Sequence, residues 1–271
     1  MLNEYHSRFL KEIERAATSR FVNDVFSDAV HMMACSLWAP LAPDRKSVET
    51  DFSATRKKYN DKEFEHIQTA FGIVMEALEA RREEFLGTIL EHLNANAKGF
   101  GQFLTPKPVA HMMGRMSIDG IKYEPGKILT ITDPACGASV LMIEQAEILM
   151  QELKVRQGDI FIMVGDIDRR AVDMSYIELS LLGYAACVEH MDALMMKRFS
   201  EPRYTAGYFL HCMPMRLPRH RREQAKAEDR QQDGGEPSKS EDVKQAEEPK
   251  ADKTITIPKS TGGAIQMELF E

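Results

Sequence analysis

The stretch Asp133-Pro134-Ala135-Cys136-Gly137-Ala138-Ser139 decides the fold of this chain. It follows the β-branched apolar run Ile128-Leu129-Thr130-Ile131-Thr132, which predicts a strand, and it leads directly into a helical pattern over residues 140–146. A strand that ends in an acidic residue, a tight turn of small residues and a helix form the plan of an α/β nucleotide site. The turn residues must be small so that the backbone can approach a ligand beyond the carboxyl ends of the strands.

A second strand with an acidic end follows. The continuous apolar run Ile160-Phe161-Ile162-Met163-Val164 predicts a buried parallel strand, and Asp166 stands at its carboxyl end. A carboxylate there can accept hydrogen bonds from both ribose hydroxyls of a bound nucleoside. Asp168 ranks second for that role, because it is the predicted N-cap of a helix that begins at Arg169 and stops at Gly183.

A third, shorter strand is predicted over Ala185-Ala186-Cys187-Val188-Glu189, and Asp192 follows it. Four segments now stand in order: Gly101-Gln102-Phe103-Leu104-Thr105-Pro106, the turn at 133–139, Gly165-Asp166-Ile167-Asp168 and His190-Met191-Asp192-Ala193-Leu194. In this order and spacing the chain resembles the N6-adenine DNA methyltransferases, especially the modification subunits of type I restriction systems. The resemblance covers roughly residues 85–194 and implies a restriction-modification or mobile-element setting in a bacterium.

The resemblance implies that the chain binds S-adenosylmethionine. The residues it assigns to this cofactor are Phe103, Thr105, Asp133, Ala135, Gly137, Asp166 and Asp192. Phe103 and Thr105 would close over the cofactor, although Phe103 can also be an ordinary buried aromatic. Asp192 would accept a hydrogen bond from the adenine amino group of the cofactor. The glycine that precedes this aspartate in the family is Met191 here, which crowds the loop.

The catalytic motif of the family, Asn-Pro-Pro followed by Phe or Tyr, has no clear counterpart. Its amide and backbone carbonyls accept the hydrogens of the target amino group, and its aromatic ring stacks on the flipped base. Tyr208-Phe209-Leu210 is the predicted fourth strand, and the degenerate segment after it contains Cys212, Met213, Pro214 and Met215. Cys212 falls where the asparagine belongs, and a thiol cannot replace an amide carbonyl. The catalytic residue is therefore unknown.

Residues 1–97 form a predicted helical N-terminal region. Apolar residues recur at helical spacing from Phe9 to Met33. A second predicted helical stretch begins near Asp61, and its apolar residues recur from Phe64 to Leu93. This region is either a helical cap on the α/β core or, by resemblance, a domain that helps modification subunits assemble or embrace DNA. The predicted roles of its histidines, His31, His66 and His92, are structural or solvent-facing.

Residues 98–215 form the predicted cofactor-binding domain, and residues 216–271 a predicted disordered, charged tail. The tail begins with Arg216, Arg219, Arg221 and Arg222, which either contact DNA phosphates or are simply solvated. It ends in a peptide that contains Gln266, Leu269 and Phe270 and resembles the peptides that dock on bacterial sliding clamps. The alternatives are a tail that folds back onto its own domain, or one without a role.

Composition sets the remaining expectations. The 271 residues carry a formal net charge of −7, which argues against coating nucleic acid by charge alone but allows a local basic face. Four scattered cysteines predict thiols in a cytoplasmic protein, with no metal site. Neither a signal peptide nor a membrane span is expected.

These observations predict an α/β fold: a partial Rossmann-like sheet of the S-adenosylmethionine-dependent methyltransferase type, a helical N-terminal region and a disordered tail. The leading functional prediction is an adenine-specific DNA methyltransferase acting on double-stranded DNA. The alternative is a catalytically silent accessory protein that joins a DNA or sliding-clamp assembly. A partner subunit that completes the sheet would be an intermediate case.

Overall fold

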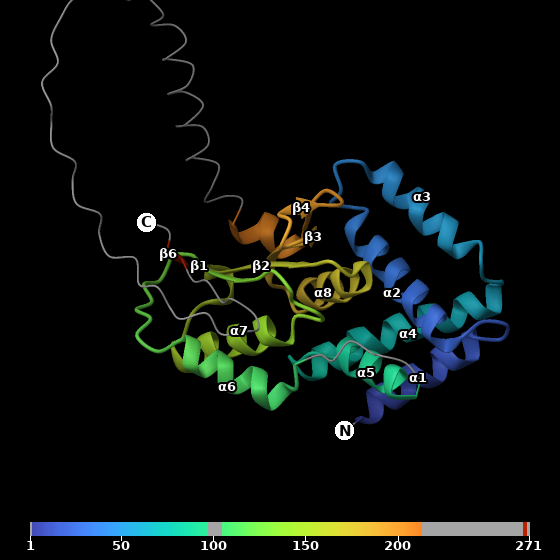
Figure 1. Ribbon diagram of the computed structural model, residues 1–271, viewed down its shortest axis with the longest axis horizontal. Coiled ribbons are helices and arrows are strands. Elements are labelled where there is room, and N and C mark those ends of the chain that lie inside the picture. The colour runs from blue at the N-terminus through green and yellow to red at the C-terminus, as the bar shows by residue number, and fades with distance from the viewer. Residues whose placement is uncertain (1, 97–104, 213–267, 270–271) are drawn as a thin grey trace, which may run out of the picture. The chain divides into compact units, whose positions relative to one another are not determined.

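The computed structural model describes residues 2–96, 105–212 and 268–269, which belong to one compact unit that spans Met1–Met213 and Gly263–Glu271 (Figure 1). The first part of this unit is helical, as predicted. Its helices are α1 (Glu4–Ala16), α2 (Val22–Trp38), α3 (Arg45–Arg56), α4 (Asp61–Ala80) and α5 (Leu86–Asn96). Among the described helices, none combines the length and apolar character that crossing a bilayer requires.

The apolar pattern of the helical region does not predict three features: the interruption between α1 and α2, the one between α4 and α5, and helix α3. The periodicity from Phe9 to Met33 is interrupted between α1 and α2, where the Thr18 hydroxyl donates a hydrogen bond to the Glu63 carboxylate of α4. A second break separates α4 from α5. Helix α3 has only a short apolar stripe: Thr55 is its one buried residue, and Val48 and Phe52 are partly buried against the core.

The sheet is mainly parallel. Strands β1 (Leu129–Asp133), β2 (Ile160–Asp166) and β3 (Ala185–Asp192) lie side by side in that order. Helix α7 (Val140–Glu152) connects β1 to β2, and α8 (Arg169–Leu181) connects β2 to β3. Helix α6 (Lys107–Ser117) precedes β1 and begins after Pro106, since proline is tolerated at the start of a helix. This arrangement confirms the α/β class and the partial Rossmann-like sheet.

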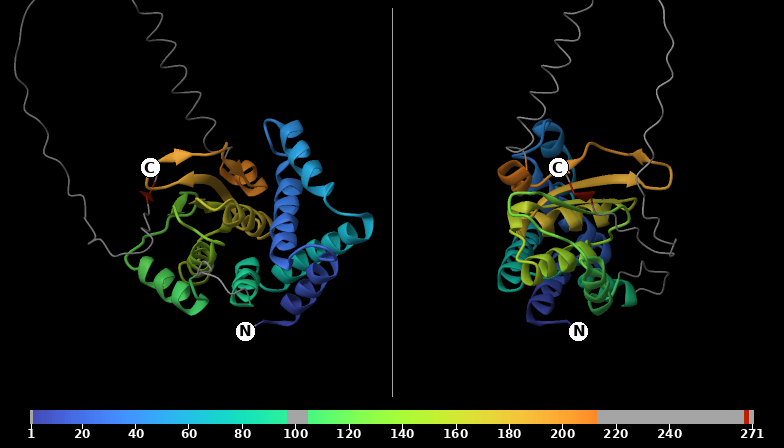
Figure 2. Two further views of the ribbon diagram at one scale, coloured as in Figure 1. Left: turned by 45° about the vertical axis from the view of Figure 1, so that its right-hand side comes forward. Right: turned by 90° about the vertical axis from the view of Figure 1, so that its left-hand side faces the viewer.

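Different groups of residues pack on the two faces of the sheet. Ile131, Ile162 and Val188 belong to the large core on the side of α7 and α8. Phe161 and Cys187 point to the other face, where they form a small second cluster with Cys212. Figure 2 shows α7 and α8 on one side of the sheet and the turn at 208–212 on the other. Because parallel strands keep one direction, the carboxyl ends of β1, β2 and β3 meet at a single edge.

Three two-residue strands extend the sheet. Strands β4 (Lys197–Arg198) and β5 (Arg203–Tyr204) pair antiparallel with β3, and β6 (Glu268–Leu269) pairs antiparallel with β1. The pairing of β6 is the arrangement that the fold-back alternative for the tail describes. Docking on a sliding clamp stays a prediction, and Gln266 and Phe270 lie outside the described residues.

The predicted fourth strand at Tyr208–Leu210 is wrong, because residues Tyr208–Cys212 form a π-helical turn. Gly207 explains how the backbone turns there, since a Cβ atom on it would lie 2.5 Å from the Tyr184 carbonyl oxygen. Aromatic contacts then hold the turn. The ring centroid of Tyr208 lies 4.5 Å from that of Tyr204 and 5.5 Å from that of Phe161.

Candidate functional site

The turn after β1 lies directly against the end of β2. The backbone amide of Cys136 donates to the Gly165 carbonyl at 3.0 Å. Gly137 has φ +55° and Ser139 has φ +64°, and both values lie in the left-handed region that favours glycine. The buried Ser139 hydroxyl donates to Ser175 Oγ of α8 at 2.8 Å, and this bond fixes a residue that would otherwise be strained. The turn is therefore anchored to both β2 and α8.

Asp166 joins the turn to the start of α8. Its Oδ2 accepts a hydrogen bond from the backbone amide of Gly137 at 2.9 Å, and its Oδ1 accepts one from the amide of Asp168 at 2.9 Å. A carboxylate offers about four acceptor positions, so lone pairs remain for a ligand. Asp168 caps α8, as predicted, because its Oδ1 accepts from the Arg170 amide at 2.9 Å.

Asp133 is buried at the end of β1, and its Oδ1 accepts a hydrogen bond from the Ala135 amide at 3.0 Å. Burial raises the pKa of Asp133, and the nearby charge of Asp166 adds to the rise, whereas the Ala135 amide opposes it. Two neighbouring carboxylates favour a positively charged ligand, because such a ligand would offset both burial and repulsion.

A cleft of about 230 Å³ opens between the ends of the three strands, lined by Asp133, Met163, Glu189 and Met191 among others. Met163 is 38% exposed although it lies in the central strand. Glu189 forms an ion pair with Arg198 at 2.7 Å. Sequence reasoning missed Glu189 and Met163 as lining residues. A charged residue inside an otherwise apolar strand was the available signal for Glu189.

Met191 lines this cleft, and Asp192 follows it at the end of β3. The Asp192 Oδ1 accepts hydrogen bonds from the backbone amides of Leu194 and Met195, both at 2.9 Å. The Met191 side chain lies against Gly165, where an added Cβ atom would be 2.9 Å from Met191 Cγ. Met191 therefore narrows the cleft, and Asp192 holds the turn after β3 while keeping further lone pairs for a ligand.

The segment expected to close over the cofactor is only partly described. Phe103 lies outside the described residues. Thr105 is exposed and precedes α6. Helix α6 is attached to α7 through Glu144, whose carboxylate lies 3.5 Å from Lys107 Nζ and 3.0 Å from His111 Nδ1. Thr105 therefore leads into a helix that packs beside the first turns of α7.

Cys212, the one residue of the degenerate catalytic segment that the structure describes, lies away from the candidate site. Cys212 is fully buried and packs with Phe161 and Ala185, at the amino ends of β2 and β3. Asp166 lies at the opposite end of β2. Aligning Cys212 with the catalytic asparagine is thus wrong in space, because β5 runs antiparallel to β3 and carries the chain back to the amino edge. The remaining predicted residues of this segment and the basic cluster lie outside the described residues: Met213, Pro214, Met215, Arg216, Arg219, Arg221 and Arg222.

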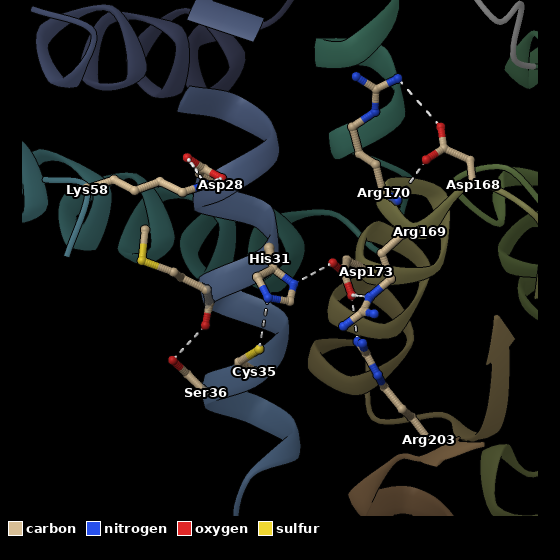
Figure 3. Close-up of polar contacts among 11 residues, drawn as sticks. Asp28, His31, Cys35, Ser36, Lys58, Asp168, Arg169, Arg170, Asp173 and Arg203 are labelled. Carbon is tan, nitrogen blue, oxygen red and sulfur yellow. Dashed lines mark hydrogen bonds and ion pairs between the residues drawn. The ribbon is translucent and has the colours of Figure 1, made fainter. Parts of the chain in front are cut away.

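A polar network that the sequence did not reveal links α8 to α2 and β5 (Figure 3). Asp173 accepts a hydrogen bond from Arg203 at 2.6 Å and lies 2.9 Å from His31 Nδ1 of α2. The bond to Asp173, with a smaller effect of Cys35, raises the pKa of His31 to about 9. Burial alone would raise the pKa of Asp173, but its contacts with His31 and Arg203 lower it. His31 thus has a structural role, as predicted, because it links α2 to α8 through Asp173.

A larger hollow of about 640 Å³ adjoins this network between α2, α3 and the start of α8. Its charged side chains pair with one another. Lys58 lies 2.9 Å from Asp28, and Arg170 lies 3.5 Å from Asp168 (Figure 3). These internal pairs leave little net charge to attract a ligand, so the smaller cleft at the strand ends is the stronger candidate.

Comparison with known proteins found one family match, over the part of the chain that contains the cleft. The family model described as N-6 DNA Methylase matches residues 83–216, which include α6, the three parallel strands and the cleft between their ends. A search of curated proteins and a search of solved structures each gave no match.

Proposed function

Because residues 83–216 belong to the N-6 DNA methylase family, we propose that the cleft at the strand ends binds S-adenosylmethionine and that the chain methylates adenine N6 in DNA. The family supports a DNA methyltransferase-like function in general. The cofactor, the adenine specificity and the activity of this chain are the parts that we propose. A restriction-modification or mobile-element setting follows from the same resemblance.

The observation that carries the proposal is the position of Asp166. Two backbone amides fix its carboxylate at the carboxyl end of β2, with lone pairs remaining for ribose hydroxyls. Asp166 directly follows Gly165, which lines the cleft, and Asp133 and Glu189 add negative charge to the cleft's lining. S-adenosylmethionine carries a sulfonium and an ammonium group, so the donor set fits its charge.

The chain's own residues would hold the cofactor and exclude water around it. Asp166 would accept from the ribose, Asp192 from the adenine amino group, and the Asp133–Gly137 turn would lie against the rest of the molecule. The segment that contains Phe103 and Thr105 would close over it. When bound, the cofactor supplies an electrophilic methyl group on its sulfur. The chain would present a flipped adenine of DNA to this methyl group as its acceptor.

A second candidate function has its own observation. Cys212 packs at the amino edge of the sheet, so no described residue stands for the catalytic asparagine. This favours a catalytically silent protein that keeps the cofactor shell and joins a DNA or sliding-clamp assembly. A partner subunit that supplies the missing strands and catalytic loop would restore activity in that case.

Transfer of label from tritiated S-adenosylmethionine to undermethylated DNA separates the two functions. The proposed enzyme places the label in N6-methyladenine, and Asp166→Ala abolishes that transfer. Cofactor binding without transfer would favour the accessory function. Adding candidate partner chains to the same assay tests whether a subunit completes the site.

A further inference from the structure

The hairpin between β3 and β4 presents an apolar tip to solvent. Leu194, Met195 and Met196 are 96%, 75% and 79% exposed. Apolar side chains are expected to avoid such exposure unless a partner covers them. We refer to residues 194–196 as the hairpin tip. The proposed cofactor site does not use it.

The hairpin tip is fixed by the strands beneath it. Met191 pairs with Arg198 and Asp192 with Lys197 across the hairpin, and the Phe199 amide donates to the His190 carbonyl at 2.8 Å. The Asp192 carboxylate accepts from the first two amides of the tip. Met196 closes the turn with φ +51°, a conformation that few non-glycine residues adopt. The backbone therefore holds the three side chains outward.

The hairpin tip lies at the carboxyl edge, the edge that holds the cleft. It begins two residues after Asp192, the end of β3. His190 Nε2 lies 3.1 Å from the carbonyl oxygen of Ile167, on the loop after Asp166. Ile167 is itself exposed and apolar. A nucleic acid that offers a base to the cleft must therefore pass beside the tip.

Basic side chains flank the hairpin tip. Lys197 is exposed, its Nζ lies 5.8 Å from the centroid of the Phe199 ring, and it forms no ion pair within residues 2–96, 105–212 and 268–269. Arg198 is 58% exposed at its side chain, although it pairs with Glu189. An apolar tip next to cations matches the chemistry of duplex DNA, which combines stacked bases with phosphates. Proteins that unstack or kink DNA insert Leu, Ile, Met or Phe between base steps.

We propose that the hairpin tip inserts into duplex DNA beside the base that enters the cleft, and that Lys197 contacts a neighbouring phosphate. This inference rests on the proposed function, because it requires DNA at the carboxyl edge. Extruding a base leaves a gap in the stack, and apolar side chains from the tip would fill that gap. The hairpin would thus lower the cost of base flipping without touching the cofactor.

The test compares the full chain with the triple variant Leu194→Ser/Met195→Ser/Met196→Ser. Each protein is titrated with a 30-base-pair duplex and with the same duplex that contains one mismatch, followed by fluorescence anisotropy. The full chain is expected to bind both duplexes, with at least a tenfold preference for the mismatched one, because its bases unstack more easily. The triple variant is expected to lose that preference and about tenfold in affinity for the matched duplex.

Two single variants sharpen the result. Lys197→Ala should weaken binding to both duplexes alike and reduce the slope of log affinity against log salt by about one. Met75→Ser changes an exposed methionine on α4 and should leave both affinities unchanged. Thermal midpoints of all variants check that each protein folds.

The outcomes separate the inference from the function on which it rests. If the triple variant binds both duplexes as the full chain does, the hairpin inference is wrong while the proposed function stands. If the full chain binds neither duplex, both fail. If the triple substitution instead changes the oligomeric mass or the binding to lipid vesicles and leaves DNA affinity unchanged, the tip serves a protein or membrane partner and the inference is overturned.

Discussion

The Asp166 carboxylate accepts a hydrogen bond from the backbone amide of Gly137 at 2.9 Å, across the boundary between β2 and the turn after β1. This bond makes the acid at the end of the second strand and the small-residue turn one unit. The second oxygen of Asp166 holds the Asp168 amide at the start of α8. The candidate cofactor site is therefore assembled by the fold itself.

The first prediction concerns Met191, which narrows the cleft. The cleft of about 230 Å³ lies below the roughly 300–1,000 Å³ of typical ligand pockets, and the Met191 side chain lies against Gly165 within it. Met191→Gly should enlarge the cleft and raise the affinity for S-adenosylmethionine by about threefold to tenfold, measured by calorimetry. A lower affinity in this variant would show that the Met191 side chain contacts the cofactor favourably.

A paired substitution provides the control for Met191. Gly165→Ala should displace Met191 into the cleft, because the new Cβ atom would lie 2.9 Å from Met191 Cγ. The affinity should then fall. In the Met191→Gly background the same alanine should have little effect. Equal losses in both backgrounds would mean that the two residues act independently.

The second prediction concerns Glu178 of α8, which is fully buried and accepts from the backbone amides of Phe85 and Leu86 at 3.1 and 2.6 Å. Burial, with a further contribution from the charge of Glu84, raises the pKa of Glu178 well above its usual range. The folded state therefore binds this proton more tightly than the unfolded state, so stability falls as pH rises from about 4.5 towards the folded pKa.

Glu178→Gln keeps an oxygen for both amides and removes the titrating proton. Between pH 5 and 8 the free energy of unfolding of the unaltered protein should fall, and that of this variant should fall less, as measured by urea unfolding. Glu124→Gln is the matched control, because Glu124 is 68% exposed at its side chain. Identical pH slopes for the Glu178 variant and the unaltered protein would contradict the prediction.

The third prediction concerns His31, whose pKa rises from 6.5 to about 9 through its contact with Asp173 (Figure 3). Because the folded pKa is raised, this stabilisation is fully present below pH 6.5 and is lost as pH rises through about 9. His31→Ala should reduce the free energy of unfolding by about 2–3 kcal/mol at pH 6, and by much less at pH 10. Urea unfolding at the two pH values measures the difference. An equal loss at both would assign the effect to packing alone.

Local patterns predicted the parts of the fold that depend on neighbouring residues. The run before Asp133 and the apolar run before Asp166 gave the parallel strands, and Gly183 ended α8 as expected. Helix α3 and the turn at 208–212 were missed for physical reasons. The first packs on the core through only a short apolar stripe, with Val48 and Phe52 partly buried, and the second is shaped by aromatic contacts between distant strands.

The candidate site likewise contains residues that the sequence predicted and residues that it did not. Acids at strand ends are visible in the sequence because parallel strands bring their carboxyl ends together. Glu189, Met163 and the Asp173 network depend on register and on contacts with α2, which one sequence does not specify. Cys212 was misplaced because matching a short motif assumed a parallel strand where the chain runs antiparallel.

The most direct test of the central claim is a calorimetric titration of S-adenosylmethionine into the unaltered protein, Asp166→Ala and Asp168→Ala. Asp168 is the matched control, because its side chain caps α8 while only its backbone amide holds Asp166. We predict binding to the unaltered protein, at least a tenfold loss for Asp166→Ala and a change of less than threefold for Asp168→Ala. Absence of binding to the unaltered protein, or equal affinity in all three, would contradict a cofactor site at the carboxyl edge of the sheet.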